Sequence, residues 1–118
     1  MATAKMRKLA LDNYPVVLNR GNGKKDTIWY EMAESAAGLL MLPQRQLTGL
    51  QLLKAAKIAD AIREAGEKGQ EDILLDEAQW NELRTAAETV RGLGQNEVEM
   101  LRRIVEAPQV DVEEAKKE

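Results

Sequence analysis

The sequence of 118 residues contains no cysteine and no histidine. Without thiols the chain has no disulfides and no thiolate nucleophile, and without imidazole it has no catalytic triad built on a histidine base. Zinc sites made of cysteine or histidine are excluded for the same reason. The remaining candidates for a catalytic base are carboxylates, lysines and tyrosines, and none of them lies in a recognisable catalytic motif. We therefore expect no enzyme, no cofactor and no metal site.

Aromatic residues are also scarce, with two Trp, two Tyr and no Phe. Carboxylate pairs such as Asp60 and Glu64 exist, but a glycosidase needs such a pair in a cleft with aromatic side chains that stack on the sugar. Long apolar runs are missing too: residues 36–42 form the longest, against about 20 residues for a membrane span. The basic residues at the N-terminus precede no apolar core of a signal peptide. These features predict a cytoplasmic protein with no membrane and no small-molecule substrate among its partners.

The charge is divided unevenly along the chain. Residues 1–57 carry nine Lys or Arg against four Asp or Glu, a net of +5, and residues 58–118 carry eight against sixteen, a net of −8. The two halves either neutralise each other within one molecule or guide the docking of another copy or partner. A third interpretation is contact with an anion or nucleic acid, although the chain is acidic overall and its basic cluster lacks interleaved aromatics. The residues for that contact are Lys5, Arg7, Lys8, Lys24 and Lys25.

The N-terminal quarter has the pattern of extended chain. Residues 8–12 alternate polar and apolar, Val16 to Leu18 is an apolar run after Pro15, and residues 27–30 are β-branched and aromatic. Between these runs, Gly21 and Gly23 supply the positive φ angles of a tight loop. The pattern predicts a β-hairpin within about residues 9–30, with strands near 15–19 and 26–30.

Helical spacing follows the predicted hairpin. We expect helices at about residues 31–42, 48–65, 76–91 and 97–107, with Pro43 ending the first and Gly66 following the second as its C′ residue. Three predicted caps are each followed three residues later by Gln or Glu, the spacing of a capping box. They are Thr48, Asp76 and Asn96. The predicted core contains Leu50, Leu53, Ile62, Leu75, Trp80, Leu83, Val90, Leu101 and Ile104.

The predicted fold class is α+β and mainly α: an N-terminal β-hairpin followed by three to four helices. Residues 1–108 form a single domain, and the charged residues 109–118 form a flexible tail. Two apolar features predict an interface for another protein or copy, because aromatics are favoured in interfaces and four adjacent apolar side chains surround a short helix on all sides. These residues are Trp29, Tyr30, Leu39, Leu40, Met41 and Leu42. The alternative is that Trp29 packs beneath a helix with Tyr30 at the rim, and that residues 39–42 are buried in the core.

Several segments resemble small proteins encoded by tailed bacteriophages and prophages. The segments are Lys8-Leu-Ala-Leu-Asp-Asn-Tyr-Pro-Val-Val-Leu18, Ile62-Arg-Glu-Ala65, Ile73-Leu-Leu-Asp-Glu-Ala-Gln-Trp-Asn-Glu-Leu83 and Ile104-Val-Glu-Ala-Pro108. The last two carry most of the similarity. The resemblance implies an accessory protein of virion structure or assembly, located in the host cytoplasm or in the virion, and it transfers no functional residue.

These observations lead to one functional hypothesis and one alternative. The hypothesis is a non-enzymatic protein–protein interaction module, a bacteriophage structural or assembly protein that self-associates as a homo-oligomer or docks on a partner. The alternative is a small nucleic-acid-associated regulator that uses the basic N-terminal segment.

Overall fold

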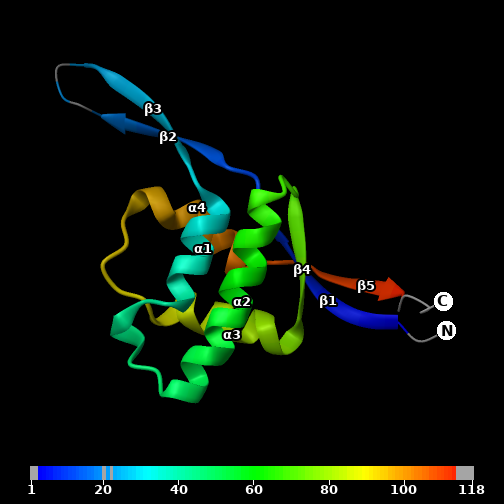
Figure 1. The fold of residues 1–118 in the computed structure, drawn as a ribbon. Helices are drawn as coiled ribbons and strands as arrows, with labels where there is room; N and C mark the ends of the chain where they lie inside the picture. Colours follow the sequence, from blue (N-terminus) through cyan, green and yellow to red (C-terminus); the bar gives the residue numbers. More distant parts are fainter. Residues whose placement is uncertain (1–2, 20, 22, 114–118) are drawn as a thin grey trace.

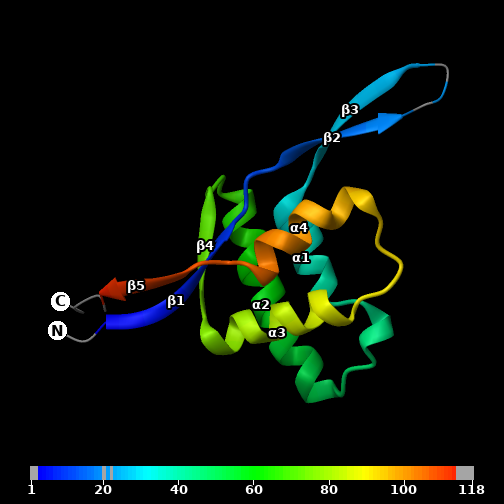
Figure 2. The same ribbon diagram turned by 180° about the vertical axis from the view of Figure 1, so that it is seen from behind.

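The computed structural model describes residues 3–19, 21 and 23–113. The described residues form four α-helices, two short 3-10 helices and five strands, arranged around a helical body from which two β-ribbons extend (Figures 1 and 2). In chain order the elements are β1 (Thr3–Ala10), β2 (Tyr14–Asn19), β3 (Lys25–Tyr30), α1 (Met32–Leu40), η1 (Pro43–Arg45), α2 (Gly49–Glu67), β4 (Asp72–Asp76), α3 (Glu77–Thr89), η2 (Gln95–Glu97), α4 (Val98–Val105) and β5 (Gln109–Glu113).

The first strand lies in the middle of a three-stranded antiparallel sheet with the order β4-β1-β5. Its C-terminal part pairs with β4, where Leu9 lies opposite Ile73, and its N-terminal part pairs with β5, where Met6 lies opposite Val110. The predicted fold, a hairpin followed by helices, is therefore wrong. The N-terminal strand finds its partners 60 to 110 positions along the chain, and a pattern in neighbouring residues contains no information about such pairing.

The C-terminal segment also differs from the prediction. We expected residues 109–118 to form a flexible tail, but Gln109–Glu113 form β5 and pair with β1. Val110 and Val112 alternate with polar residues, a pattern compatible with a strand. The backbone of β5 forms its ladder of hydrogen bonds with β1. Residues 114–118 of the predicted tail lie outside the described residues.

Strands β2 and β3 form a separate antiparallel hairpin, from the Tyr14–Tyr30 pair at its base to the Asn19–Lys25 pair near its loop. The hairpin projects from the helical body as an arm (Figure 1). Gly21 and Gly23 in its loop have φ angles of +73° and +71°, a conformation that glycine adopts without steric cost. The loop end of the hairpin thus lies away from the helical body, while its base adjoins the body.

Helices α2 and α3 begin as their sequences predict. Thr48 and Asp76 each accept a hydrogen bond from the backbone N–H three residues on, and the Gln side chain at that position accepts one in return. These are capping boxes. Asn96 is not the cap of α4, because residues 95–97 form the turn η2 and the helix starts at Val98 without a side-chain cap.

Gly66 lies inside α2 and not at the predicted C′ position. A Cβ atom built on Gly66 would be 2.5 Å from the Cβ of Ala33 in α1, so the missing side chain permits the close approach of the two helices. The positive φ expected after the helix occurs instead at Gly69, which has a φ of +73°.

The core lies between the helices and one face of the three-stranded sheet. Five predicted core residues are buried, namely Ile62, Leu75, Trp80, Leu83 and Ile104, while Val90 and Leu101 pack partly buried against them. Leu50 and Leu53 were wrongly predicted, since they are 67% and 64% exposed. The buried face of α2 begins only at Ala55, because the first turns of the helix extend to the lower end of the molecule (Figures 1 and 2).

Candidate interaction surface

One face of the hairpin is exposed and largely apolar. Its register places Pro15 opposite Trp29 and Val17 opposite Thr27, and since alternate residues of a strand point to the same side, these four residues share one face. All four are exposed; Trp29 exposes 66% and Val17 57% of its surface. We call this surface, made of Pro15, Val17, Thr27 and Trp29, the Trp29 face.

The opposite face of the hairpin turns toward the body near its base. Tyr14 and Val16 are buried there, and the rings of Tyr14 and Tyr30 stack with their centroids 4.9 Å apart. The Tyr30 hydroxyl lies 3.8 Å from the sulfur of Met100. One face of the hairpin therefore belongs to the core and the other remains open.

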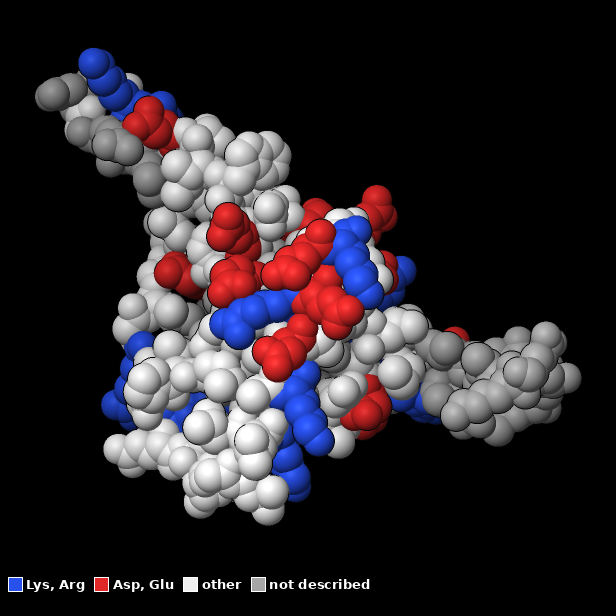
Figure 3. Space-filling model, in the orientation of Figure 1, with Lys and Arg blue, Asp and Glu red and all other residues white. Residues whose placement is uncertain are grey.

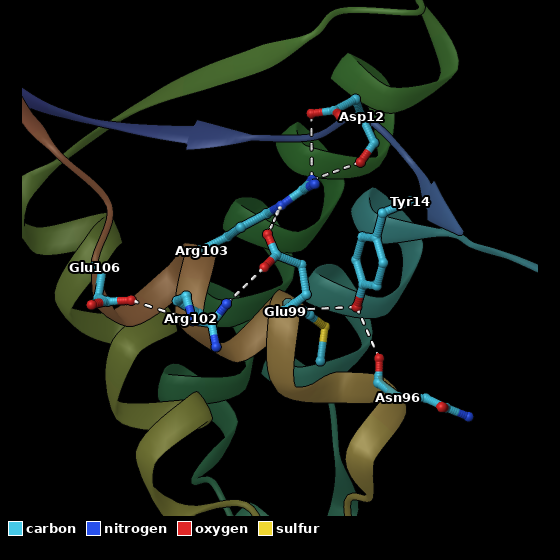
Figure 4. A network of polar contacts seen from close by, with 8 residues as sticks. Asp12, Tyr14, Asn96, Glu99, Arg102, Arg103 and Glu106 are labelled. Atoms are coloured by element: carbon cyan, nitrogen blue, oxygen red, sulfur yellow. Dashed lines mark hydrogen bonds and ion pairs between the residues drawn. The ribbon is translucent and has the colours of Figure 1, made fainter. Parts of the chain in front are cut away.

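A network of hydrogen bonds fixes the base of the hairpin to α4 (Figure 4). The Tyr14 hydroxyl donates to the carbonyl oxygen of Asn96 at 3.1 Å and accepts from the backbone N–H of Met100 at 3.2 Å. The Arg103 guanidinium donates to the carbonyl oxygen of Asp12 at 2.7 Å and to the Glu99 carboxylate at 2.8 Å. The arm is thus held at a defined position on the body.

The same burial changes the acidity of the two tyrosines. Desolvation raises the pKa of Tyr14 above its ordinary value, partly offset by the hydrogen bond from Met100, which stabilises the phenolate. Desolvation is also the main reason why the pKa of Tyr30 is raised. Both hydroxyls accordingly remain protonated, and the Tyr14 hydroxyl keeps its donor role well above neutral pH.

Charges of opposite sign flank the hairpin. Basic side chains lie at its far end beside an acidic one, and acidic side chains with basic ones between them gather over the body near its base (Figure 3). Lys24 and Lys25 are exposed at the far end. An open groove near the base is lined by Arg63, which is paired with Glu34 at 3.1 Å, and by further acidic residues. These are Asp12, Glu31, Glu67 and Glu71.

The predicted interface residues separate into two groups. Leu39 and Leu40 are buried within the core on α1 and are not available to a partner, which contradicts the prediction for them. The apolar run at residues 39–42 can be buried because α1 packs against three helices, α2, α3 and α4, which cover it from several sides. Met41 and Leu42 are half-buried against the same core. Of the two aromatic residues, Trp29 is exposed and Tyr30 is half-buried.

The basic residues considered for anion or nucleic-acid contact do not form one surface. Lys5, Arg7 and Lys8 lie on β1, whereas Lys24 and Lys25 lie on the hairpin, which leaves the body in another direction (Figure 1). Arg7 has a structural role, because its guanidinium donates to Glu77 and to the carbonyl oxygen of Ala107. Lys8 pairs with Asp72 at 3.5 Å.

The sequence analysis missed a second exposed apolar surface. Leu50, Leu52 and Leu53 are exposed on the first turns of α2, next to the half-buried Leu47. We call Leu50, Leu52 and Leu53 the leucine patch. Residues 50, 52 and 53 do not lie on one face of a helix, so the three leucines cannot all point into the core. This spacing could have indicated that some of them are exposed.

Neither a metal-binding cluster nor a membrane-spanning helix occurs in the described part of the chain. Within residues 3–19, 21 and 23–113, no group of three or more carboxylates is placed to hold a metal ion. No helix in that part has both the length and the apolar composition that crossing a bilayer requires. Comparison with protein-family models, curated proteins and solved structures finds no match to the chain.

Proposed function

We propose that this protein acts by binding another protein through the Trp29 face of its hairpin. The observation that carries the proposal is the exposure of Trp29 and Val17, with two further exposed residues, on an arm whose base is fixed. Tryptophan is among the residues that contribute most to binding energy in interfaces. A preorganised arm also loses little conformational entropy when it binds.

The proposed setting is the structure or assembly of a tailed bacteriophage, in the host cytoplasm or in the virion. This part rests on the resemblance of residues 73–83 and 104–108 to small phage accessory proteins. Self-association and docking on a different protein are both compatible with the Trp29 face. In either case the protein contributes a surface and no chemical reaction.

Photo-crosslinking from the Trp29 face tests this function. A photoreactive phenylalanine analogue replaces Trp29 in the full chain, expressed together with its neighbouring genes, and a matched variant carries the analogue at the exposed Asn81 on α3. We expect covalent protein adducts from position 29 and none from position 81. Absence of any protein adduct at position 29, or equal adducts at both positions, would contradict the proposal. Adduct masses distinguish a second copy of this chain from a different protein.

A further inference from the structure

The hairpin has two outer edges, one along β2 and one along β3. Only the β3 edge has a backbone N–H at every residue. β2 and β3 form a two-stranded sheet among the described residues, so each strand has one side without a strand partner. On β2, Pro15 has no N–H to offer, and the groove lined by Tyr14 to Val17 has residues of η2 and α4 as its other wall. The edge of β3 therefore remains as the surface to which another strand can be added.

The position of Pro15 determines which backbone groups of β3 point outward. The ladder runs through the Pro15–Trp29 pair, which must be a pair without mutual hydrogen bonds because Pro15 cannot donate one. Trp29 consequently directs its N–H and C=O away from β2, and so do Thr27 and Lys25 at two-residue intervals. Any strand that adds to this edge must pair with these three residues.

We infer that the β3 edge pairs antiparallel with the same edge of a second copy, with Ile28 on the two-fold axis. In this register Thr27 exchanges backbone hydrogen bonds with Trp29 of the second copy, and Lys25 lies opposite Glu31 of the second copy. The inference rests on the proposed function, since it names the partner of the same hairpin. A C2 arrangement makes every such contact occur twice.

Charge and polarity select this register from the few that the backbone permits. Centring the axis on Asp26 places Lys25 opposite Thr27, and centring it on Thr27 places Lys25 opposite Trp29. Centring it on Trp29 places Glu31 opposite Thr27, so none of these three registers sets a basic residue opposite an acidic one. Centring it on Ile28 pairs two apolar side chains and creates two Lys25–Glu31 ion pairs. Glu31 continues the line of the strand, because its φ of −81° and ψ of 94° are extended, and it is exposed.

The pairing also accounts for an otherwise unfavourable feature of the hairpin. A two-stranded ribbon that projects from the core is marginal by itself, and an open apolar edge is a site for unwanted association. Val17, Ile28 and Trp29 are all more than 40% exposed on this ribbon. A four-stranded sheet made by two copies would give the β3 edges hydrogen-bond partners and cover part of the exposed side chains.

Disulfide crosslinking tests the register directly, because the natural chain has no cysteine. In the proposed dimer, position 28 faces itself in a pair without mutual hydrogen bonds, where Cα atoms are about 4.5 Å apart, within the range of a disulfide. We expect Ile28→Cys to form a linked dimer upon mild oxidation. Val17→Cys, at a position that is more exposed than Ile28 but lies on the other strand, should remain monomeric under the same conditions. Equal crosslinking of the two variants, or none at position 28, would overturn the register.

A charge exchange supplies the second measurement. Lys25→Glu and Glu31→Lys should each weaken self-association by about tenfold in sedimentation equilibrium, and the double variant should restore it. Wild-type protein that remains monomeric at several hundred micromolar would overturn the proposed dimer. If position 29 still crosslinks to a different protein in that case, the proposed function stands and only the inference of a second copy fails.

Discussion

The guanidinium of Arg7 lies over the indole ring of Trp80, with 3.9 Å between the guanidinium carbon and the ring centroid. The indole N–H donates to the carbonyl oxygen of Ile104 at 2.8 Å. Arg7 comes from β1, Trp80 from α3 and Ile104 from α4, so one aromatic side chain joins the sheet to two helices. The same contact removes Arg7 from the residues available to an anion.

The two tryptophans should differ sharply in their contribution to stability. Trp80 is 4% exposed and Trp29 is 66% exposed. Trp80→Ala should lower the free energy of unfolding by about 3–5 kcal/mol, because it leaves a cavity in the core and removes the hydrogen bond from the indole to the Ile104 carbonyl oxygen. Trp29→Ala should lower it by less than about 1 kcal/mol, the value of a cross-strand contact. Urea denaturation measures both, and similar losses for the two variants would contradict the assignment of one ring to the core and the other to the surface.

Gly66 should be intolerant of even one methyl group. Alanine usually stabilises a helix relative to glycine by about 0.5–1 kcal/mol, but a Cβ at this position would meet Ala33 at 2.5 Å. Gly66→Ala should therefore lower the melting temperature. Gly38→Ala is the matched control, because nothing lies within 4 Å of its added Cβ, and it should raise the melting temperature. A stabilising Gly66→Ala would show that α1 and α2 do not approach this closely.

Tyr14 should make the protein sensitive to alkali. Its pKa is raised in the folded state by burial, so the folded chain holds this proton more tightly than the unfolded chain does. The stabilisation is complete below the ordinary tyrosine pKa of about 10 and is lost as the pH rises from there through the raised folded value. Between pH 9 and 11, wild type should lose more unfolding free energy than Tyr14→Phe. Parallel curves for the two proteins would contradict the role of this hydroxyl.

Patterns among neighbouring residues predicted some helix starts correctly, but they could not predict strand pairing between distant segments. The capping boxes at Thr48 and Asp76 depend only on residues three positions apart, and the structure contains both. The pairing of β1 with β4 and β5 depends on segments more than 60 residues away, and the predicted fold class was wrong for that reason. Gly66 was predicted as a helix terminator, because a sequence alone does not show that Ala33 lies against it.

The candidate site shows the same division. Trp29 was predicted as an interface residue, but the pattern of β3 fits a buried as well as a projecting strand, so the sequence alone could not decide between exposure and burial of this side chain. The run at Leu39 and Leu40 has too many apolar residues for one helical face, and the structure resolves this by packing other helices around it. Leu50 and Leu53 belong to a similar excess of apolar residues, but they are exposed, because the first turns of α2 extend beyond the helical body.

Amide hydrogen exchange tests the central claim most directly. The protein is measured alone at low concentration and again in the complex recovered intact from cells that express its neighbouring genes. We predict slower exchange in the complex for residues 25–30 of the hairpin, with little change at the leucine patch and in α3. Slower exchange at the leucine patch, with an unchanged hairpin, would contradict the account and assign the binding surface to α2.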